Sequence, residues 1–203
     1  MNIGLAGNVN SQNSYVNIPS KKETINQMSA NIFAFTEVEK RSQGEIIGLT
    51  MIPEEYNGMT YGMVAIWPED FRVDNPIIQI SSNAKGENHV YNIEINKINP
   101  ENATEMEMFA LCSYADKIGK GSGSTFGSYQ TMSLLRNYGN MVNESSIENK
   151  STWDDFQNAK KNWVNLCSEM VDFLGSTKNI DCYDLMMKGQ KLLDFFNDSK
   201  SEK

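Results

Sequence analysis

Few residues in this chain have the type and spacing that catalysis requires. His89 is the single histidine, so any Cys–His or Ser–His–acid mechanism would have to use it. The cysteines Cys112, Cys167 and Cys182 are far apart and form no Cys-x-x-Cys pair, so the ligand spacing of a zinc site is absent. We therefore predict no catalytic residue, no cofactor and no metal ion.

One enzymatic alternative stays open. Adjacent carboxylates at positions 54–55 and 69–70 could in principle act as an acid and a base, although neither pair has a partner that the sequence identifies. A hydrolase that combines Cys112, or an acidic pair, with His89 is therefore the alternative to a non-enzymatic protein.

A glycine-rich segment, GKGSGSTFG over 119–127, could let backbone amides approach an anion. A phosphate-binding P-loop places its lysine after the glycines, whereas Lys120 precedes most of them, and the segment follows a predicted helix rather than a strand. We interpret it as a flexible link between two helices. An anion or peptide contact at Gly121, Ser122 and Gly123 is the alternative.

Aromatic residues provide the other candidate interaction site. Trp67 is followed by Pro68 and Phe71 at the predicted end of a strand, which favours an exposed aromatic anchor. His89 lies at the start of another strand, beside a turn. Most of the twelve methionines and three tryptophans are expected to fill the core.

The composition limits the class of protein. A chain of 203 residues with 39% hydrophobic residues can bury a substantial core, and its net charge of −8 argues against nucleic-acid binding. No run approaches the roughly 18 apolar residues of a membrane helix, so we expect no membrane insertion. The N-terminus lacks the pattern of a signal peptide, which predicts a cytoplasmic protein.

The elements that must position these residues follow from hydrophobic periodicity. Alternation with a period of two predicts strands over 31–38, 45–52, 60–67, 77–81 and 89–98, with a tight hairpin turn at Asn57-Gly58. Short connections favour an antiparallel meander of about five strands. Residues 1–20 are rich in Asn, Ser and Gly and are expected to form a flexible arm, leaving 21–203 as a single domain.

The second half of the chain changes to a helical period of 3.6. Apolar spacing predicts helices over 101–118, 126–138, 151–174 and 181–197, the second ended by Gly139 and the third by Gly175. Acidic residues at 101, 105 and 107 favour the positive end of the first helix dipole. The expected class is therefore α+β, with the sheet at 31–98 and three or four helices, within 101–197, packed on one of its faces.

The segments GEIIGLTMIPEEYNGMTYGMVAIW, TEMEMFALCSYAD and GSTFGSYQ carry a family resemblance. Residues 43–130 resemble a family of small proteins of unknown function from Gram-positive, gut-type bacteria. The resemblance implies a bacterial origin and transfers no catalytic residue or ligand.

Taken together, these observations favour a non-enzymatic bacterial protein that binds another protein or a small ligand. Its oligomeric state is not specified by any residue group. A further alternative is an exported protein associated with the cell surface or an appendage, because the uncharged arm at 1–20 could act as an uncleaved export segment.

Overall fold

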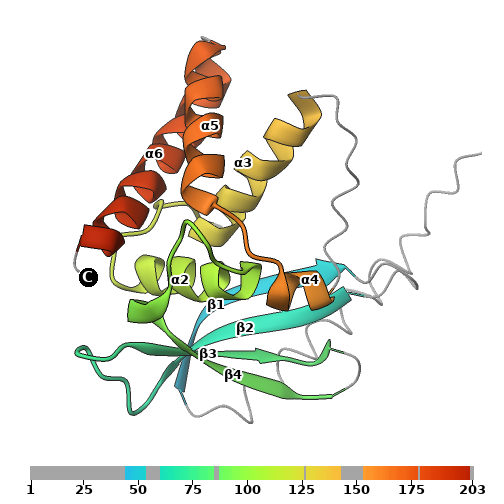
Figure 1. The fold of residues 1–203 in the computed structure, drawn as a ribbon, viewed down its shortest axis with the longest axis vertical. Helices are drawn as coiled ribbons and strands as arrows, with labels where there is room; N and C mark the ends of the chain where they lie inside the picture. The colour runs from blue at the N-terminus through green and yellow to red at the C-terminus, as the bar shows by residue number, and fades with distance from the viewer. Residues whose placement is uncertain are drawn as a thin grey trace, which may run out of the picture.

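The computed structural model describes residues 44–53, 60–84, 87–125, 127–142, 153–177 and 179–201. Within these residues the protein is an α+β fold built in layers (Figure 1). An antiparallel sheet forms one layer, helices α2 (Glu105–Lys117) and α4 (Trp153–Asn158) lie on one of its faces, and three longer helices stand on the far side of α2. The predicted fold class is therefore confirmed.

The sheet has four described strands in the order β1-β2-β3-β4, each antiparallel to the next. The strands are β1 (Gly44–Pro53), β2 (Thr60–Pro68), β3 (Ile77–Ser82) and β4 (His89–Glu94). The predicted meander is thus present with four strands, one fewer than expected. The predicted arm at 1–20, the strand at 31–38 and the turn at Asn57-Gly58 lie outside the described residues.

The last predicted strand is too long. We expected it to continue to Ile98, but β4 ends at Glu94 and the chain enters a short 3-10 helix, η2 (Ile95–Lys97). Ile95 is 6% exposed and joins the core, and its backbone N–H donates to the Pro76 carbonyl at 2.9 Å. Burial of this one side chain decides where the strand ends.

Helix α2 begins later than predicted, at Glu105 rather than near position 101. The Thr104 side chain accepts a hydrogen bond from the Glu107 N–H at 3.2 Å, and the Glu107 carboxylate accepts from the Thr104 N–H at 2.7 Å. This reciprocal capping box satisfies two amides that the first turn would otherwise leave bare. Glu105 is instead buried and accepts a hydrogen bond from Lys161 Nζ at 2.8 Å.

The predicted helix over 151–174 is broken into two helices, α4 and α5 (Trp163–Ser176). Between them Lys161 forms an isolated antiparallel bridge with Ala103, just before α2. The side chain of Asn162 then accepts from the Asn165 N–H at 2.9 Å and caps α5. Apolar spacing continues through the break, so periodicity alone could not reveal it.

The two glycines expected to end helices do not do so. Helix α3 (Ser128–Val142) passes through Gly139, and α5 ends one residue after Gly175. Gly175 also lacks the positive φ that a helix-ending glycine adopts. Helix α6 (Ile180–Ser201) then returns along α5 as the antiparallel partner that the short connection predicts (Figure 1).

Strand β1 and helix α2 meet at Gly48. The register of β1 shifts between Ile46 and Gly48, which marks a β-bulge. A Cβ atom at Gly48 would lie 2.2 Å from Ser113 Oγ and 3.3 Å from the Ala65 Cβ. Only a glycine allows the helix to approach the strand this closely, and the contact fixes where α2 crosses the sheet edge.

No described helix has both the length and the apolar character needed to cross a membrane.

Candidate functional site

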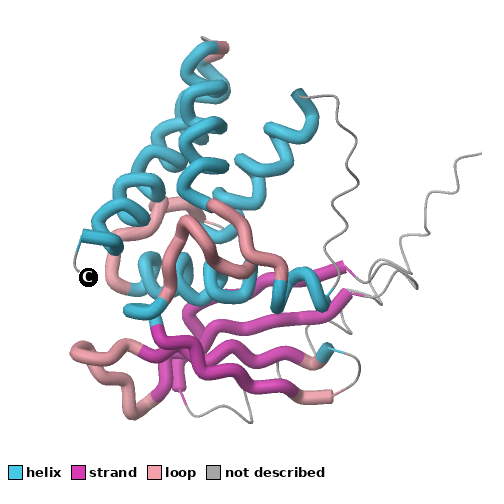
Figure 2. Tube along the Cα trace, viewed as in Figure 1, coloured by secondary structure: helices cyan, strands magenta, loops and turns pink. Residues whose placement is uncertain are grey.

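A groove of about 1060 Å³ runs beside β1, bounded by α2, by the start of α3 and by the loop that joins them. Figure 2 shows this connection as a loop between the two helices. The middle of α6 also contributes, through Lys191. The groove therefore combines segments that are up to 145 positions apart in the chain, from Ile46 to Lys191.

One wall of the groove is the edge of the sheet. Four consecutive residues of β1, from Ile46 to Leu49, line it. The β-bulge between Ile46 and Gly48 leaves Ile47 without a partner in β2, so the groove follows the strand where its regular pairing is interrupted. Among the described strands, β1 has only β2 as a neighbour, and its other side carries backbone groups that no described strand pairs.

The opposite wall is apolar. Phe109 of α2 and Tyr129 of α3 meet edge to face, with ring centroids 5.2 Å apart. Leu134, one turn further along α3, also lines the groove, and 54% of its surface is exposed. Leu134 therefore offers an exposed apolar contact beside the edge of β1 that no described strand pairs.

Asp116 fixes the loop at the end of the groove. Its carboxylate accepts two hydrogen bonds from Ser128, from the backbone N–H at 2.7 Å and from Oγ at 2.5 Å. Ser128 Oγ in turn accepts from the Ser122 N–H at 2.7 Å. Asp116 thus occupies the amino end of α3, and an external anion does not have that position available.

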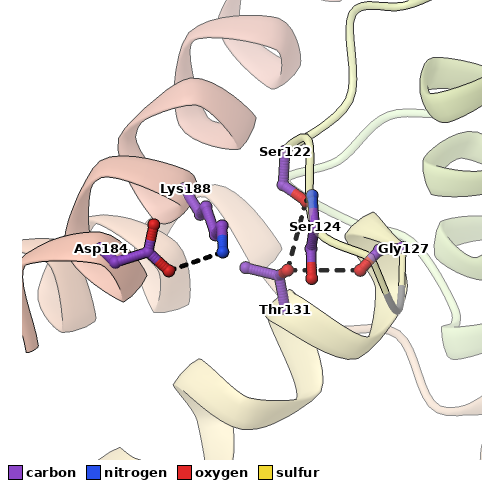
Figure 3. A network of polar contacts seen from close by, with 6 residues as sticks. All are labelled: Ser122, Ser124, Gly127, Thr131, Asp184 and Lys188. Atoms are coloured by element: carbon purple, nitrogen blue, oxygen red, sulfur yellow. Dashed lines mark hydrogen bonds and ion pairs between the residues drawn. The ribbon is translucent and has the colours of Figure 1, made fainter.

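A second set of hydrogen bonds closes the loop on itself (Figure 3). Ser122 Oγ lies 3.2 Å from Thr131 Oγ1 and accepts from the Ser124 N–H at 3.2 Å. Thr131 Oγ1 donates to the Gly127 carbonyl, also at 3.2 Å. Figure 3 also shows Asp184 and Lys188 of α6, which form an ion pair at 2.6 Å.

Gly121 makes this compact loop possible. A Cβ atom there would lie 1.9 Å from Asp116 Oδ1 and 2.6 Å from Ser128 Oγ, so any larger residue would separate the two. Gly123 adopts a φ of 75°, which L-residues with side chains rarely adopt. The expected flexible link is therefore a tied loop in the structure, because Asp116 and Ser128 supply the bonds that composition could not show.

Lys191 is the one cation among the described residues that line the groove. Its Nζ lies 3.9 Å from the position that a Cβ atom at Gly123 would occupy. No carboxylate in the described part of the chain lies within ion-pairing distance of Lys191, whereas Lys188, one turn earlier, is paired with Asp184. The loop end of the groove therefore carries the cation of Lys191 as well as the carboxylate of Asp116, which Ser128 holds.

Trp67 and Phe71, the aromatic residues that the sequence suggested as an interaction site, lie outside the groove. Trp67 is half-buried, not exposed as predicted, because it stacks on Phe71 with ring centroids 3.5 Å apart and on Tyr114 at 6.0 Å. Lys117 Nζ lies 5.8 Å from the centre of the Trp67 ring. These side chains cover the end of α2 instead of forming an open anchor.

His89 is on the other edge of the sheet, in β4, level with Ser82 of β3. Its ring lies near Tyr91 and Trp153, with centroids 6.2 and 6.4 Å away, and Glu87 is 4.0 Å from Nε2. The structure thus brings Gly121 and Gly123 to the groove, with Ser122 bonded directly behind them, and places Trp67, Phe71 and His89 outside it.

Two cysteines are too deeply buried to act as nucleophiles in this conformation. Burial raises the pKa of Cys167 to about 12. Burial, with smaller effects from Asp116 and Cys167, raises the pKa of Cys112 well above its ordinary value. A thiol that stays protonated and inaccessible gives no support to the hydrolase alternative.

The pKa of Cys167 makes stability depend on pH. The folded state holds the proton up to about pH 12, while the unfolded chain releases it near 9, so this stability is present below pH 9 and is lost as the pH rises towards 12. We expect the free energy of unfolding to fall by about 1 kcal/mol per pH unit above 9 from this thiol. Urea unfolding of the wild type and Cys167→Ala at pH 8–10.5 measures it; equal slopes would contradict the assignment.

Metal-binding geometry is not found in the described residues: no three His, Cys, Asp or Glu side chains there form a group that could hold an ion.

No family model matches the chain, and neither a curated protein nor a solved structure matches it. The resemblance of residues 43–130 to a bacterial family of unknown function therefore stays a prediction. The function of the groove therefore follows from its own geometry and lining residues.

The groove lining includes residues that the sequence did not mark as candidates, among them Asp116, Leu134 and Lys191. Asp116 carries a usable signal, because an acidic side chain in the last turn of a helix opposes the helix dipole and therefore indicates a donor from outside that helix. Leu134 and Lys191 carry none, since an apolar residue and a lysine are both ordinary on an amphipathic helix.

Proposed function

We propose that this protein is a binding module that takes an extended segment of a partner protein into the groove. The partner segment adds, as a further strand, to the edge of β1 that no described strand pairs, and lays alternate side chains against Tyr129 and Leu134. Strand addition of this kind draws affinity from main-chain hydrogen bonds and specificity from the side-chain pockets. The observation that carries the proposal is that the edge of β1 which no described strand pairs lies directly beside the groove.

The dimensions of the groove favour a peptide over a small molecule. Four strand residues span about 13 Å, which is long enough for three or four residues of a partner. The volume of about 1060 Å³ reaches the upper end of the range for small-molecule pockets, roughly 300–1,000 Å³. The described lining combines apolar side chains with hydroxyl and amide groups, one cation and one carboxylate, and it includes no cysteine or histidine.

The charged groups that line the groove limit which partner segments fit it. The chain as a whole carries a net charge of −8, yet the loop end of the groove offers the ammonium group of Lys191, which no described carboxylate pairs, beside the carboxylate of Asp116, which accepts two hydrogen bonds from Ser128. An apolar segment with a negative group near one end complements this arrangement.

The same proposal places the protein in the cytoplasm, where three free, buried thiols stay reduced.

Leu134→Asp tests the proposal without disturbing the core, since the side chain is half exposed. The probe is an array of synthetic decapeptides of random sequence, and fluorescence polarisation then gives the affinity of the peptides that bind. We expect the Leu134→Asp variant to bind these peptides about tenfold or more weakly than the wild type, because a carboxylate replaces an apolar contact in the groove.

Tyr183→Asp is the matched control, because Tyr183 is a helix residue that is 55% exposed and lies outside the groove. We expect it to bind the same peptides as the wild type does. An array with no binding peptide would refute the proposal, and so would peptides that bind the Leu134 variant equally well.

A further inference from the structure

We infer that the loop end of the groove recognises a C-terminal carboxylate, so that the partner segment is the extreme C-terminus of another protein. This inference rests on the proposed function and names the ligand class of the same site. The three observations behind it are the position of Lys191, the free backbone amides of the loop, and the direction in which a strand can add to β1.

Lys191 supplies the charge. Its ammonium group lines the groove and lies close to the Gly123 backbone, with no acidic partner among the described side chains. A carboxylate bound there would form a charge-assisted hydrogen bond, which is stronger than one between neutral groups. Asp116 is the one acidic residue that lines the groove, and its two oxygens already accept from Ser128.

The loop supplies neutral donors. The N–H groups of Gly123 and Thr125 donate to no acceptor in the described structure, whereas Ser122 and Gly127 use theirs within the loop. Gly123 has a φ of 75°, a left-handed conformation. Backbone N–H groups around such a residue commonly form concavities that bind anions, including peptide C-termini.

Strand direction puts the C-terminus at this loop. Lys117 at the end of α2 pairs with Glu45 at the start of β1, and Ser113 lies over Gly48, so α2 runs opposite to β1. The loop that follows α2 therefore lies at the start of β1. An antiparallel strand added to β1 has its C-terminal end at that position, and antiparallel pairs outnumber parallel ones about two- to three-fold.

The test compares each binding decapeptide with a free C-terminus and with the same C-terminus amidated. Amidation removes the negative charge and leaves the rest of the peptide intact. For the wild-type protein we expect amidation to weaken binding about tenfold or more, as for loss of a hydrogen bond to a charged group. For Lys191→Gln we expect weak binding of both forms and little difference between them.

Lys188→Gln is the matched control, because Lys188 is on the same helix, is paired with Asp184 and is not part of the groove lining. It should discriminate between the two peptide forms as the wild type does. Peptides that bind the wild type equally well in both forms would overturn this inference and leave the proposed function standing. A Lys191→Gln variant that still prefers the free carboxylate would also overturn this inference and leave the proposed function standing. An array with no binding peptide would overturn both the inference and the proposed function.

Discussion

Replacing Asp116 by alanine is expected to lower the free energy of unfolding by about 2–3 kcal/mol and to abolish peptide binding in the groove. The variant leaves two buried donors of Ser128, the backbone N–H and Oγ, without their acceptor. Each buried donor that loses its acceptor costs about 1–3 kcal/mol, and water entering from the groove offsets part of this. Ser122 then loses its fixed partner, so the loop no longer presents its amides to the groove.

Urea unfolding followed by circular dichroism measures the stability of this variant, and fluorescence polarisation measures its peptide affinity. Asp172→Ala is the control, because Asp172 is an exposed aspartate on α5 and its removal should change stability by no more than about 0.5 kcal/mol. Asp116→Asn should lie between the two, since its amide retains one oxygen acceptor. If Asp116→Ala is as stable as the control, the carboxylate does not hold the loop.

The second large effect is expected at Trp163, which is 1% exposed at the start of α5. Its indole N–H donates to the Ala103 carbonyl at 2.8 Å, and its backbone N–H donates to the Pro100 carbonyl at 2.9 Å. Trp163→Ala removes the largest fully buried side chain and leaves a cavity, which costs about 3–5 kcal/mol. Chemical unfolding followed by circular dichroism measures this loss.

Trp163→Phe separates packing from hydrogen bonding. The phenylalanine ring retains most of the buried volume, and the Ala103 carbonyl still accepts from the Lys161 N–H at 2.9 Å. We therefore expect this variant to lose only about 1 kcal/mol. A loss as large as that of the alanine variant would show that the indole hydrogen bond, not the filled volume, joins α5 to the start of α2.

Both large effects arise where segments distant in sequence meet. Asp116 connects the end of one helix to the beginning of the next across the glycine loop, and Trp163 connects α5 to the residues just before α2. These contacts connect α3 and α5, two helices of the outer layer, to the two ends of α2 (Figure 1). The groove lies between these layers, so its shape depends on the same contacts.

Much of the fold could be predicted because it depends on local patterns. Alternation of apolar residues located β1, β2 and β3 to within about two residues. The burial of Met63 and Val64 shows that β2 is covered on both faces. The helical spacing at 108, 111, 112 and 115 correctly located the buried face of α2. Patterns of this kind show which side of a helix or strand faces the core, and they do not depend on how the other elements are arranged.

Element boundaries were harder to predict, because they depend on partners elsewhere in the chain. The break before α5 exists because Lys161 bridges to Ala103, nearly 60 positions away, and β4 ends because Ile95 turns into the core. Trp67 is covered because Phe71 and Tyr114 stack near it. None of these contacts leaves a periodic trace in the sequence.

The sequence by itself determined the α+β class, the antiparallel order of the strands and the glycine loop between two helices, since each follows from periodicity or from backbone freedom within a short segment. Only the tertiary structure decided that the loop is tied down by Asp116, and that Leu134 and Lys191 share a groove with the edge of β1. The physical reason is that a groove is a property of surfaces brought together by packing. Its residues need no common spacing, because one strand, three helices and a loop carry them to one place.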